Sequence, residues 1–547
     1  MNEPSTMCEA FHRTVAQRPD AIALRGTTSH TWADYAARAA AIAGGLAAAG
    51  VEKGDTVALL LSNRPEFHFA DTAVQHLRAV PFSCYNTSSP EQLRFLMGAS
   101  GARVAITEQR LAPALRGSVN TILLVDDLPA WERPGFDLAS AATTVRPDDL
   151  LTLVYTSGTT GRPKGVEITH ANMVAMVAAT APMFGVRAGD RLVSFLPAAH
   201  IADRLNSHYL HLWAGTEVTC LPDIRDLAAA LVEVRPTLFG AVPEVWQRIV
   251  TSIRNLSDPT QRAAVAQAVE IGLRHQHTRA AGDELAMLHR AAEHRVLAPL
   301  RAKLGLDQVR VAVTAAAPTP PEVVEFINAI GVPLIEAWGM SELSGVGTMV
   351  PPGTVRSGTI GLPIPAVEAR LLDDGELLVR GPTVTRGYKD QPDETAAAID
   401  PDGWLHTGDI ATRDEDGYLH LIDRKKDLLI TTGGKNIAPA AVELALKTHC
   451  PLIGQAVVVG DARPHLTALI VLDPEMVRGM DDETIAASIG KGVEAANATL
   501  SRPEQVRAFD VLTEPWPPGG DLVTPTMKVR RRAVLARYAD RIEALYR

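Results

Sequence analysis

Short apolar runs alternate with helix-like stretches along the first third of the chain. Three of the runs, at 55–61, 79–83 and 103–107, have the length and composition of buried strands. Helices are expected around them, at 31–50, 65–78 and 90–100. Strands separated by helices pair in parallel through right-handed crossovers, so the pattern predicts an α/β fold.

The same alternation continues to about residue 338, with one interruption. Strands are predicted at 150–155, 191–197, 217–222, 236–242, 309–314 and 332–338. The interruption, at 252–305, has almost no strand signal and a long helical pattern rich in Ala, Arg, Glu and His. We expect a helical insertion between two strands there, either a solvated surface excursion or part of a substrate tunnel.

Beyond Gly353 the pattern changes to short strands and turns, which predicts a small β-rich unit at 353–422. A charged run at 423–427 follows, either a solvated patch or a swivel between domains. The remaining 120 or so residues predict a separate α+β domain. Its expected elements are helices at 439–448 and 482–499, strands at 455–460 and 465–472, and a basic C-terminal helix. We therefore divide the chain into domains 1–422 and 423–547.

Length, composition and charge narrow the functional class. The chain has 547 residues, of which 46% are hydrophobic and 21% charged, as expected for a multidomain globular protein. A formal charge of −10 argues against nucleic-acid binding, which needs clustered Lys and Arg. The N-terminus lacks the basic segment of a secretory signal. The four scattered cysteines form no C-x-x-C pair, which favours free thiols in a reducing cytoplasm.

One uncharged stretch, at 168–186, could be mistaken for a membrane span. His170, Asn172 and Pro182 interrupt it, and a spanning helix needs about 20 mostly apolar residues. A buried helix is the better interpretation.

The stretch "YTSGTTGRPKG" (155–165) has the composition of a phosphate-binding loop. Its glycines let backbone N–H groups turn toward an anion, its hydroxyls add neutral donors, and Lys164 adds a positive charge. It does not match the common loop G-x-x-x-x-G-K-[ST], because Gly165 follows the lysine. Thr169 is placed to cap a helix that begins at His170. On composition alone, a flexible surface turn is the alternative.

A second stretch, "EAWGMSEL" (336–343), follows a predicted strand. Trp338 offers a flat face to a purine, Gly339 permits close backbone approach, and Glu342 is an oxygen ligand suited to Mg²⁺. The preceding "TAAAPTP" (314–320) supplies small residues against which an adenine ring could lie. In isolation, an aromatic residue beside a glycine is more often part of a core or a turn.

Three further stretches carry charged residues in turns or loops. Asp409 in "GWLHTGD" could accept hydrogen bonds from two ribose hydroxyls or simply shape a turn. "DRKKDLLITTGGKN" (423–436) and "DLVTPTMKVRRR" (521–532) are a charged run and the basic start of a helix when each is taken alone.

Together and in this order, the five stretches resemble the signature blocks of the adenylate-forming superfamily of acyl-CoA synthetases, adenylation domains and luciferases. The first matches its block nearly residue for residue, and the resemblance covers essentially the whole chain. It implies a large N-terminal domain of stacked α/β sheets with a small β-rich unit, and a smaller mobile α+β C-terminal domain. It also implies that a carboxylate attacks the α-phosphorus of ATP, giving acyl-AMP and pyrophosphate. The acyl group then passes to a thiol, usually that of coenzyme A.

Site residues follow from the resemblance position by position. Thr156 and Glu342 match Mg²⁺ ligands, Lys528 matches the lysine that bridges the α-phosphate and the carboxylate, and Asp423 matches the hinge. The implied ATP-binding residues are Thr156, Ser157, Gly158, Thr159, Thr160, Gly161, Lys164, Ala316, Ala317, Pro318, Glu336, Ala337, Trp338, Gly339, Met340, Ser341, Asp409, Arg424 and Lys528. Those implied on the thioester-forming side are Gly433, Gly434, Lys435 and Asn436. The chain departs from the family pattern at Ala315, where glycine is usual, and at Trp338, where tyrosine is usual.

The implied substrate is a long-chain fatty acid. "FLPAAHIADR" (195–204), the segment 423–439 and the helical insertion resemble long-chain and very-long-chain (bubblegum-like) acyl-CoA synthetases. An apolar tunnel would bind the acyl tail with about 0.8 kcal/mol per buried CH₂ group. His200 has two interpretations that stay open here, a helix-start histidine or a wall of the substrate pocket.

Other functions stay open on the sequence alone. They are a ligase for an aryl, bile-acid-like or polyketide-type acid, a ligase that delivers to a carrier protein, and a non-catalytic acyl- or nucleotide-binding protein. A kinase-type reaction is disfavoured because the GK[ST] pattern is missing. The oligomeric state is undetermined. We expect a cytoplasmic protein without a transmembrane segment, whose arginines at 530–532, 537 and 541 either contact a membrane surface or lie on a solvated helix.

Overall fold

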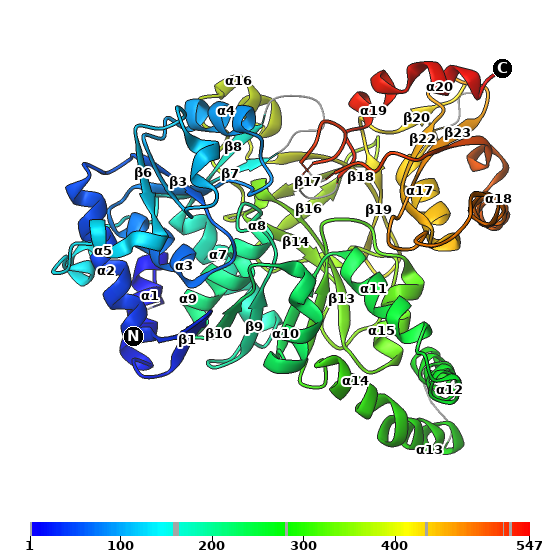
Figure 1. The fold of residues 1–547 in the computed structure, drawn as a ribbon, viewed down its shortest axis with the longest axis horizontal. Coiled ribbons are helices and arrows are strands. Elements are labelled where there is room, and N and C mark those ends of the chain that lie inside the picture. The colour runs from blue at the N-terminus through cyan, green and yellow to red at the C-terminus, as the bar shows by residue number, and fades with distance from the viewer. Residues whose placement is uncertain (1–2, 157–162, 279–282, 433–435, 518, 525–527) are drawn as a thin grey trace. The chain divides into compact units, whose positions relative to one another are not determined.

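The computed structural model describes residues 3–156, 163–278, 283–432, 436–517, 519–524 and 528–547 (Figure 1). The described chain forms two compact units. Unit 1 contains Met1–Thr156, Pro163–Ala369 and Val379–Leu405, and unit 2 contains Arg370–Leu378 and His406–Arg547. The pivot predicted at Asp423 lies within unit 2 and stays a prediction.

The first sheet of unit 1 has six strands in the order β6-β5-β3-β4-β7-β8. Their bounds are Thr56–Leu60 (β3), Val80–Ser83 (β4), Val104–Thr107 (β5), Thr121–Leu124 (β6), Leu150–Thr156 (β7) and Lys164–Thr169 (β8). The first five strands in this order pair in parallel, as the alternation of strands and helices predicts. β8 pairs antiparallel with β7, and neither β6 nor β8 is predicted by the sequence pattern.

Helices of the first sheet begin at caps that are visible in the sequence. In α2 (Trp32–Ala48), Thr31 and Asp34 form a capping box, and in α4 (Pro90–Ser100), Ser89 and Gln92 form another. α1 (Met7–Gln17) begins at Thr6, and α3 (Pro65–His76) has proline at its first position. Because these signals are local, the sequence places the helices within a few residues of their ends.

Two further sheets complete the core of unit 1. One has the order β2-β1-β10-β9, and the other has the order β11-β12-β13-β14-β15. Their bounds are Ile22–Arg25 (β1), Ser29–Thr31 (β2), Arg191–Ser194 (β9), Glu217–Cys220 (β10), Leu238–Ala241 (β11), Val311–Thr314 (β12), Leu334–Met340 (β13), Gly345–Met349 (β14) and Leu362–Pro363 (β15). β11, β12 and β13 are parallel, so their carboxyl ends share one edge of the sheet.

Helices fill the sequence between β11 and β12, where the insertion is predicted. They are α11 (Pro243–Arg254), α12 (Pro259–His277), α13 (Asp283–Ala292), the π-helical η5 (Glu293–Leu297) and α14 (Ala298–Leu304). α12 packs on α15 (Pro321–Ala329), where a Cβ on Gly272 would lie 2.4 Å from the carbonyl oxygen of Ala329. Figure 1 shows α12 and α13 side by side at the edge of unit 1.

The stretch at 168–186 forms α7 (His170–Met183), which begins at a capping box of Thr169 and Asn172. The predicted cap at Thr169 is confirmed, although only part of this helix is buried. None of the helices in the described ranges combines the length and hydrophobicity that a bilayer crossing requires.

The next helical segment runs through α8 (Ile201–Asp203), the π-helical η3 (Arg204–Tyr209) and α9 (Leu210–Ala214). Two residues of η3 form a buried ion pair with Asp71. Arg204 Nη1 lies 2.7 Å from Asp71 Oδ2, and His208 Nε2 lies 3.0 Å from Asp71 Oδ1. All three side chains are 0% exposed. Breaking this ion pair would leave a buried charge without a partner, which is unfavourable. The pair therefore fixes the rotation of η3 about its axis.

Unit 2 is an α+β unit around a three-stranded sheet in the order β22-β23-β24. Its elements from residue 419 on are β19 (Leu419–Arg424), β20 (Leu429–Ile430), β21 (Asn436–Ile437), α17 (Pro439–His449), β22 (Ile453–Val459), β23 (Leu466–Leu472), α18 (Asp482–Thr499), β24 (Val506–Leu512), α19 (Arg531–Arg537) and α20 (Ala539–Ala544). β19 pairs antiparallel with β18 (Leu405–Arg413), which crosses from one unit to the other. The pattern does not predict β24, whose alternation is weak.

Candidate active site

The signature stretch spans the β7–β8 hairpin. β7 ends at Thr156, β8 begins at Lys164, and these two residues face each other in the antiparallel register. Both strands belong to a sheet with a buried core, so the two ends are held firmly. Of the predicted phosphate-binding residues, Ser157, Gly158, Thr159, Thr160 and Gly161 lie outside the described residues.

A chain of contacts joins Lys164 to the predicted metal ligand. Lys164 Nζ pairs with Glu394 and lies 4.8 Å from the ring centroid of Tyr388, within cation–π range. The Tyr388 hydroxyl donates to Glu342 Oε1 at 3.0 Å. Tyr388 therefore connects two predicted site residues that lie far apart in the sequence.

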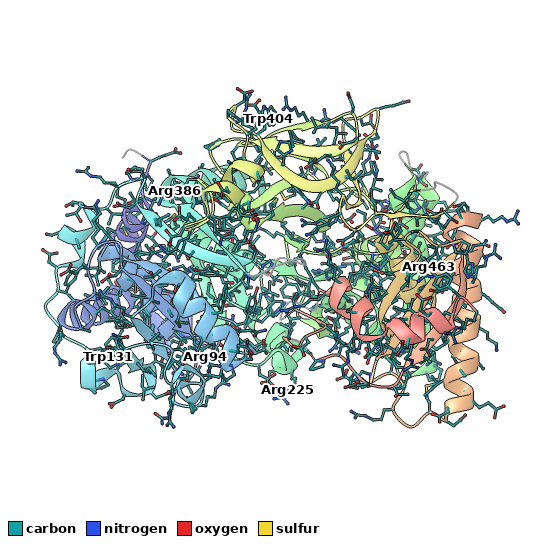
Figure 2. All side chains as sticks on the ribbon, turned by 90° about the horizontal axis from the view of Figure 1, so that it is seen from above. Arg94, Trp131, Arg225, Arg386, Trp404 and Arg463 are labelled. Atoms are coloured by element: carbon teal, nitrogen blue, oxygen red, sulfur yellow. The ribbon has the colours of Figure 1, made fainter. Side chains whose placement is uncertain are left out.

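An ion pair and backbone contacts hold the segment around Tyr388 against β8. Arg386, labelled in Figure 2, pairs through Nε with Glu167 Oε2 at 2.7 Å. Lys389 N donates to the carbonyl oxygen of Gly165, and Val166 bridges to Tyr388. The sequence analysis does not select Tyr388. A tyrosine after a glycine in a β-rich segment is an ordinary strand residue until its neighbours are known.

Glu342 lies in the short helix η6 (Ser341–Leu343) at the end of β13 and is 7% exposed. Its carbonyl oxygen accepts from Thr385 N at 2.8 Å. The pairing of β13 with β14 requires glycine at position 339, because a Cβ there would lie 1.8 Å from the carbonyl oxygen of Gly345. These contacts hold the carboxylate at the edge where the parallel strands end.

Trp338 is packed into its sheet and is 7% exposed. A Cβ on Gly347 would lie 2.6 Å from a ring carbon of Trp338, so Gly347 makes room for the indole. Little of the ring surface is open, and the predicted stacking on adenine stays a prediction. Ala337, its neighbour in β13, is also buried.

Ala316, Ala317 and Pro318 follow the carboxyl end of β12 and are exposed. Ala316 has φ 75°, in the left-handed region that favours glycine. Ligands of open α/β sheets bind beyond the carboxyl ends of parallel strands, which is where these residues and Glu342 lie.

Glu336 lies nearby on β13 and accepts from Gly358 N at 3.0 Å. Burial outweighs this hydrogen bond and raises the pKa of Glu336 to about 7.

Asp409 and Arg424 are cross-strand partners in β18 and β19 of unit 2. Arg424 Nε lies 2.6 Å from Asp409 Oδ1, and Asp409 is 2% exposed. The two residues predicted to lie near the ribose are thus adjacent.

Asp423 ties the end of β19 to the start of α17. Its Oδ1 accepts from Arg424 N at 2.7 Å, and its Oδ2 accepts from Ala440 N at 3.0 Å in the first turn of α17. Burial raises the pKa of this carboxyl. A carboxylate at a helix N-terminus is a favourable arrangement, and here it lies at the predicted hinge.

Lys528 is exposed. Its N–H donates to Thr524 Oγ1 at 3.0 Å, and its carbonyl oxygen accepts from Thr524 N at 2.8 Å. Three residues later, Arg531 bonds to Glu443 Oε1 at 2.5 Å and to the carbonyl oxygen of Val458 at 2.6 Å. Arg531 thus fixes the segment behind Lys528 to α17 and β22.

The predicted thioester-side residues fall mostly outside the described part of the chain. Gly433, Gly434 and Lys435 are among the residues not described, and Asn436 is described only as the β21 residue paired with Ile430. The structure thus groups the predicted residues into a set around β8, β12 and β13 in unit 1 and a set around β18, β19 and α17 in unit 2.

An apolar cavity of about 40 Å³ lies in unit 1 beside η3. It is lined by Phe184, Leu192, Val193, Phe195, Leu196, Asp203, Asn206, Ser207, Leu210, Leu238, Phe239, Gly240, Val311 and Val313. His200 is not in this lining. Its Nδ1 accepts from Ala202 N at 3.1 Å and caps α8, which favours the helix-start interpretation.

The residues at Glu342 fit a magnesium ion. Tyr388 occupies Oε1, whereas no described residue hydrogen-bonds to Oε2. A carboxylate and the hydroxyl of Thr156 are the oxygen donors that Mg²⁺ prefers. No group of three His, Cys, Asp or Glu within the described ranges could hold a metal by itself.

Comparisons with known proteins cover nearly the whole chain. The family profile described as "AMP-binding enzyme" matches residues 11–389, and "AMP-binding enzyme C-terminal domain" matches residues 426–547. The protein fadD11 of Mycobacterium tuberculosis, provisionally named a fatty-acid–CoA ligase, is 44% identical over 78% of this chain and 78% of its own. The long-chain-fatty-acid–CoA ligase FadD15 of Mycobacterium bovis is 35% identical over 95% of this chain and 92% of its own. The long-chain-fatty-acid–CoA ligase ACSBG1 of Bos taurus is 29% identical over 99% and 85%.

Solved structures share the fold. The o-succinylbenzoate coenzyme A synthetase MenE of Bacillus subtilis, in complex with ATP and magnesium ion, has a TM-score of 0.73 at 24% identity over 96% of this chain and 98% of its own. A Mycobacterium tuberculosis fatty acyl CoA synthetase has a TM-score of 0.64 at 22% identity over 98% and 99%. The expected mixed α/β fold with a smaller C-terminal part is confirmed. With both profiles matched in order, the chain belongs to the family of AMP-binding enzymes.

Proposed function

We propose that this chain is an ATP-dependent, AMP-forming ligase that joins a long-chain fatty acid to coenzyme A. The observation that carries the proposal is the connected set Lys164–Tyr388–Glu342, which lies beside the β7–β8 hairpin. It combines a cation for phosphate with a carboxylate that has one oxygen open. The acid and the acceptor come from the names of relatives that match nearly the whole chain.

The first half-reaction brings two anions together, the fatty carboxylate and the α-phosphate of ATP. Lys164 and the hydroxyls of the signature stretch are proposed to hold the leaving pyrophosphate. Thr156 and Glu342 would hold Mg²⁺, which when bound neutralises phosphate charge and favours loss of pyrophosphate. Lys528 is proposed to bridge the carboxylate and the α-phosphate, and Asp409 with Arg424 to bind the ribose.

The second half-reaction needs a different set of groups at the acyl-AMP. We propose that residues 423–547 rotate about Asp423 between the two steps, removing Lys528 and presenting Gly433, Gly434, Lys435 and Asn436 toward coenzyme A. Asp423 lies between β19 and α17, where two backbone N–H groups hold its carboxylate, and its proposed role as the pivot comes from the family resemblance.

The apolar cavity beside η3 is the proposed binding place for part of the acyl tail. Each CH₂ group moved from water into such a lining contributes about 0.8 kcal/mol. A cavity of about 40 Å³ is smaller than a long chain requires, so the lining side chains must move apart when the acid binds.

We also propose a cytoplasmic location. All four cysteines are buried and unpaired, as suits a reducing compartment. Contact of the C-terminal arginines with a membrane has little support, because Arg531, Arg537 and Arg541 are paired with Glu443, Glu514 and Asp510.

A pyrophosphate-release screen tests the proposed function. Acids from C2 to C24 and aryl acids would be supplied with ATP, Mg²⁺ and coenzyme A, and the nucleotide product identified. We expect AMP as the product and the highest kcat/KM with long chains. A maximum at acetate or benzoate would contradict the assigned substrate, and ADP would contradict adenylation itself.

A further inference from the structure

The cavity beside η3 has one polar wall. Of its fourteen lining residues, eleven are apolar or glycine and three are polar, Asp203, Asn206 and Ser207. All three come from the junction of α8 and η3. In mostly apolar ligand pockets, a few such polar groups fix the orientation of the ligand.

The backbone of η3 explains why these side chains face the cavity. A π-helical turn is wider than an α-helical one and changes the side chains' directions, and such turns are frequent at functional sites. On one side, Arg204 and His208 are bound to the buried Asp71. Asn206 and Ser207 line the cavity instead. The ion pair prevents η3 from turning and withdrawing them.

Asp203 and Ser207 already have partners. The hydroxyl of Ser207 donates to Asp203 Oδ1 at 3.0 Å, and that of Ser194 lies 3.2 Å from Asp203 Oδ2. Asn63 Nδ2 in turn donates to Ser194 Oγ at 2.8 Å. This hydrogen-bond network fixes the positions of Asp203 and Ser207 at the cavity.

Asn206 differs from its two neighbours. No residue in the described ranges hydrogen-bonds to its amide, although the side chain lines the cavity and is only partly exposed. Its Nδ2 would lie 3.4 Å from a Cβ on Gly240 of β11, so the absence of a side chain there leaves space beside the amide. The amide offers one acceptor and two donor hydrogens to whatever enters.

We propose that Asn206 is a specificity-determining residue that binds a hydroxyl group carried on the hydrocarbon chain of the acid. The hydroxyl would donate to Oδ1 or accept from Nδ2, while the apolar lining contacts the methylene groups on either side. An unsubstituted chain would displace water from the amide and leave it without a partner, which is unfavourable. This inference rests on the proposed function and names the substrate class as a hydroxylated long-chain acid.

The test compares acids of one length on the full chain. Pyrophosphate release would be measured with hexadecanoic acid and with its 2-, 3-, 10- and 16-hydroxy derivatives, for the wild type and for Asn206→Leu. We expect one hydroxy isomer to exceed hexadecanoic acid in kcat/KM by about tenfold, as one net hydrogen bond allows. In Asn206→Leu this preference should disappear, with hexadecanoic acid used at least as well as by the wild type.

Ser207→Ala is the matched control, because it removes a hydroxyl from the same wall whose partner is Asp203. It should leave the ratio between the two acids unchanged. If Asn206→Leu lowers the melting temperature, Asn206→Ser keeps a small polar group and should retain part of the preference. A wild type that uses no hydroxy isomer better than hexadecanoic acid, or an unchanged ratio in Asn206→Leu, would overturn the inference.

Failure of the proposed function gives a different result. Stabilisation of the wild type by each acid alone would be measured as a shift in melting temperature, without ATP. A melting-temperature shift with one hydroxy acid that exceeds the shift with hexadecanoic acid, and that is lost in Asn206→Leu, supports the subsite even if no acid is converted. The absence of both turnover and a selective shift would reject both proposals.

Discussion

At the scale of single residues, Tyr388 is the side chain that the structure adds to the predicted site. Its hydroxyl donates to Glu342 Oε1, and its ring lies next to Lys164. The tyrosine acts through the orientation of the Glu342 carboxylate, so we regard it as a positioning residue. The family resemblance assigns Glu342 and Lys164 but says nothing about what holds them, because that partner lies more than 40 residues from either.

Tyr388→Phe tests the orientation of the Glu342 carboxylate separately from its charge. The ring beneath Lys164 remains, and the hydrogen bond to Glu342 is lost. We expect a roughly tenfold higher Mg²⁺ concentration for half-maximal pyrophosphate release, in line with the loss of one hydrogen bond to a charged group. Glu342→Gln should lower the rate of pyrophosphate release far more than Tyr388→Phe does, at every Mg²⁺ concentration. An unchanged Mg²⁺ dependence in Tyr388→Phe would rule out the positioning role.

Asp203 predicts a pH effect on stability. Burial raises its pKa to about 7 in the folded chain, far above the ordinary aspartate range. Between these two values the folded state holds more protons than the unfolded state. This carboxyl therefore makes the protein less stable as the pH rises from about 4 to 7.

Melting temperatures of the wild type and Asp203→Asn at pH 5 and pH 8 test this sign. The advantage of the variant should be larger at pH 8 by about 2 °C. The pH-dependent contributions of other groups, including Glu336, are the same in both proteins and cancel when the two melting temperatures are subtracted. A difference that is equal at both pH values would mean that Asp203 titrates normally.

At the scale of elements, the insertion is held by close packing of α12 on α15. Gly272 of α12 approaches the carbonyl oxygen of Ala329, and a Cβ would lie 2.4 Å from that atom. By contrast, Gly490 lies within α18, where a Cβ would meet nothing within 4 Å. The two glycines have the same local helical setting but opposite surroundings.

Alanine substitution should therefore have opposite effects at these positions. Gly272→Ala should destabilise the protein by about 1–3 kcal/mol, because backbone atoms must shift. Gly490→Ala should stabilise α18 by about 0.5–1 kcal/mol, since glycine is a poor helix former. Chemical denaturation measures both changes. Equal effects would show that α12 can move away from α15 without cost.

At the scale of the whole molecule, the central question is how one chain performs two reactions. Lys528 is exposed, while Arg531 anchors the segment behind it through Glu443 and Val458. We therefore expect Lys528→Ala to leave Arg531 and its contacts with Glu443 and Val458 in place. This allows its chemical role to be tested separately from its structural surroundings.

Lys528→Ala should abolish formation of acyl-AMP while leaving conversion of supplied acyl-AMP to acyl-CoA largely intact. The physical reason is that only the first half-reaction brings two anions together at the lysine. Both half-reactions would be followed separately by pyrophosphate release and by thioester formation. Equal loss of the two would contradict rotation of residues 423–547.

Local patterns determined much of this protein from the sequence alone. Helix bounds at 90–100 and 482–499 follow from caps and periodicity, and they agree with α4 and α18. The composition of the first signature stretch indicated phosphate binding, which needs glycines, hydroxyls and a lysine that are adjacent in sequence. The adenylation chemistry followed from the resemblance of all five stretches to the adenylate-forming superfamily. Such information survives in a single sequence because it depends on neighbours within a few residues.

Only the tertiary structure decided which distant residues meet. It placed Tyr388 between Lys164 and Glu342, paired Asp71 with Arg204 across 133 positions, and opened the amide of Asn206 to a cavity. These contacts depend on strand register, on a π-helical turn and on the packing of one layer against another. No local pattern encodes them, because each arises from side chains that become neighbours only when the chain has folded.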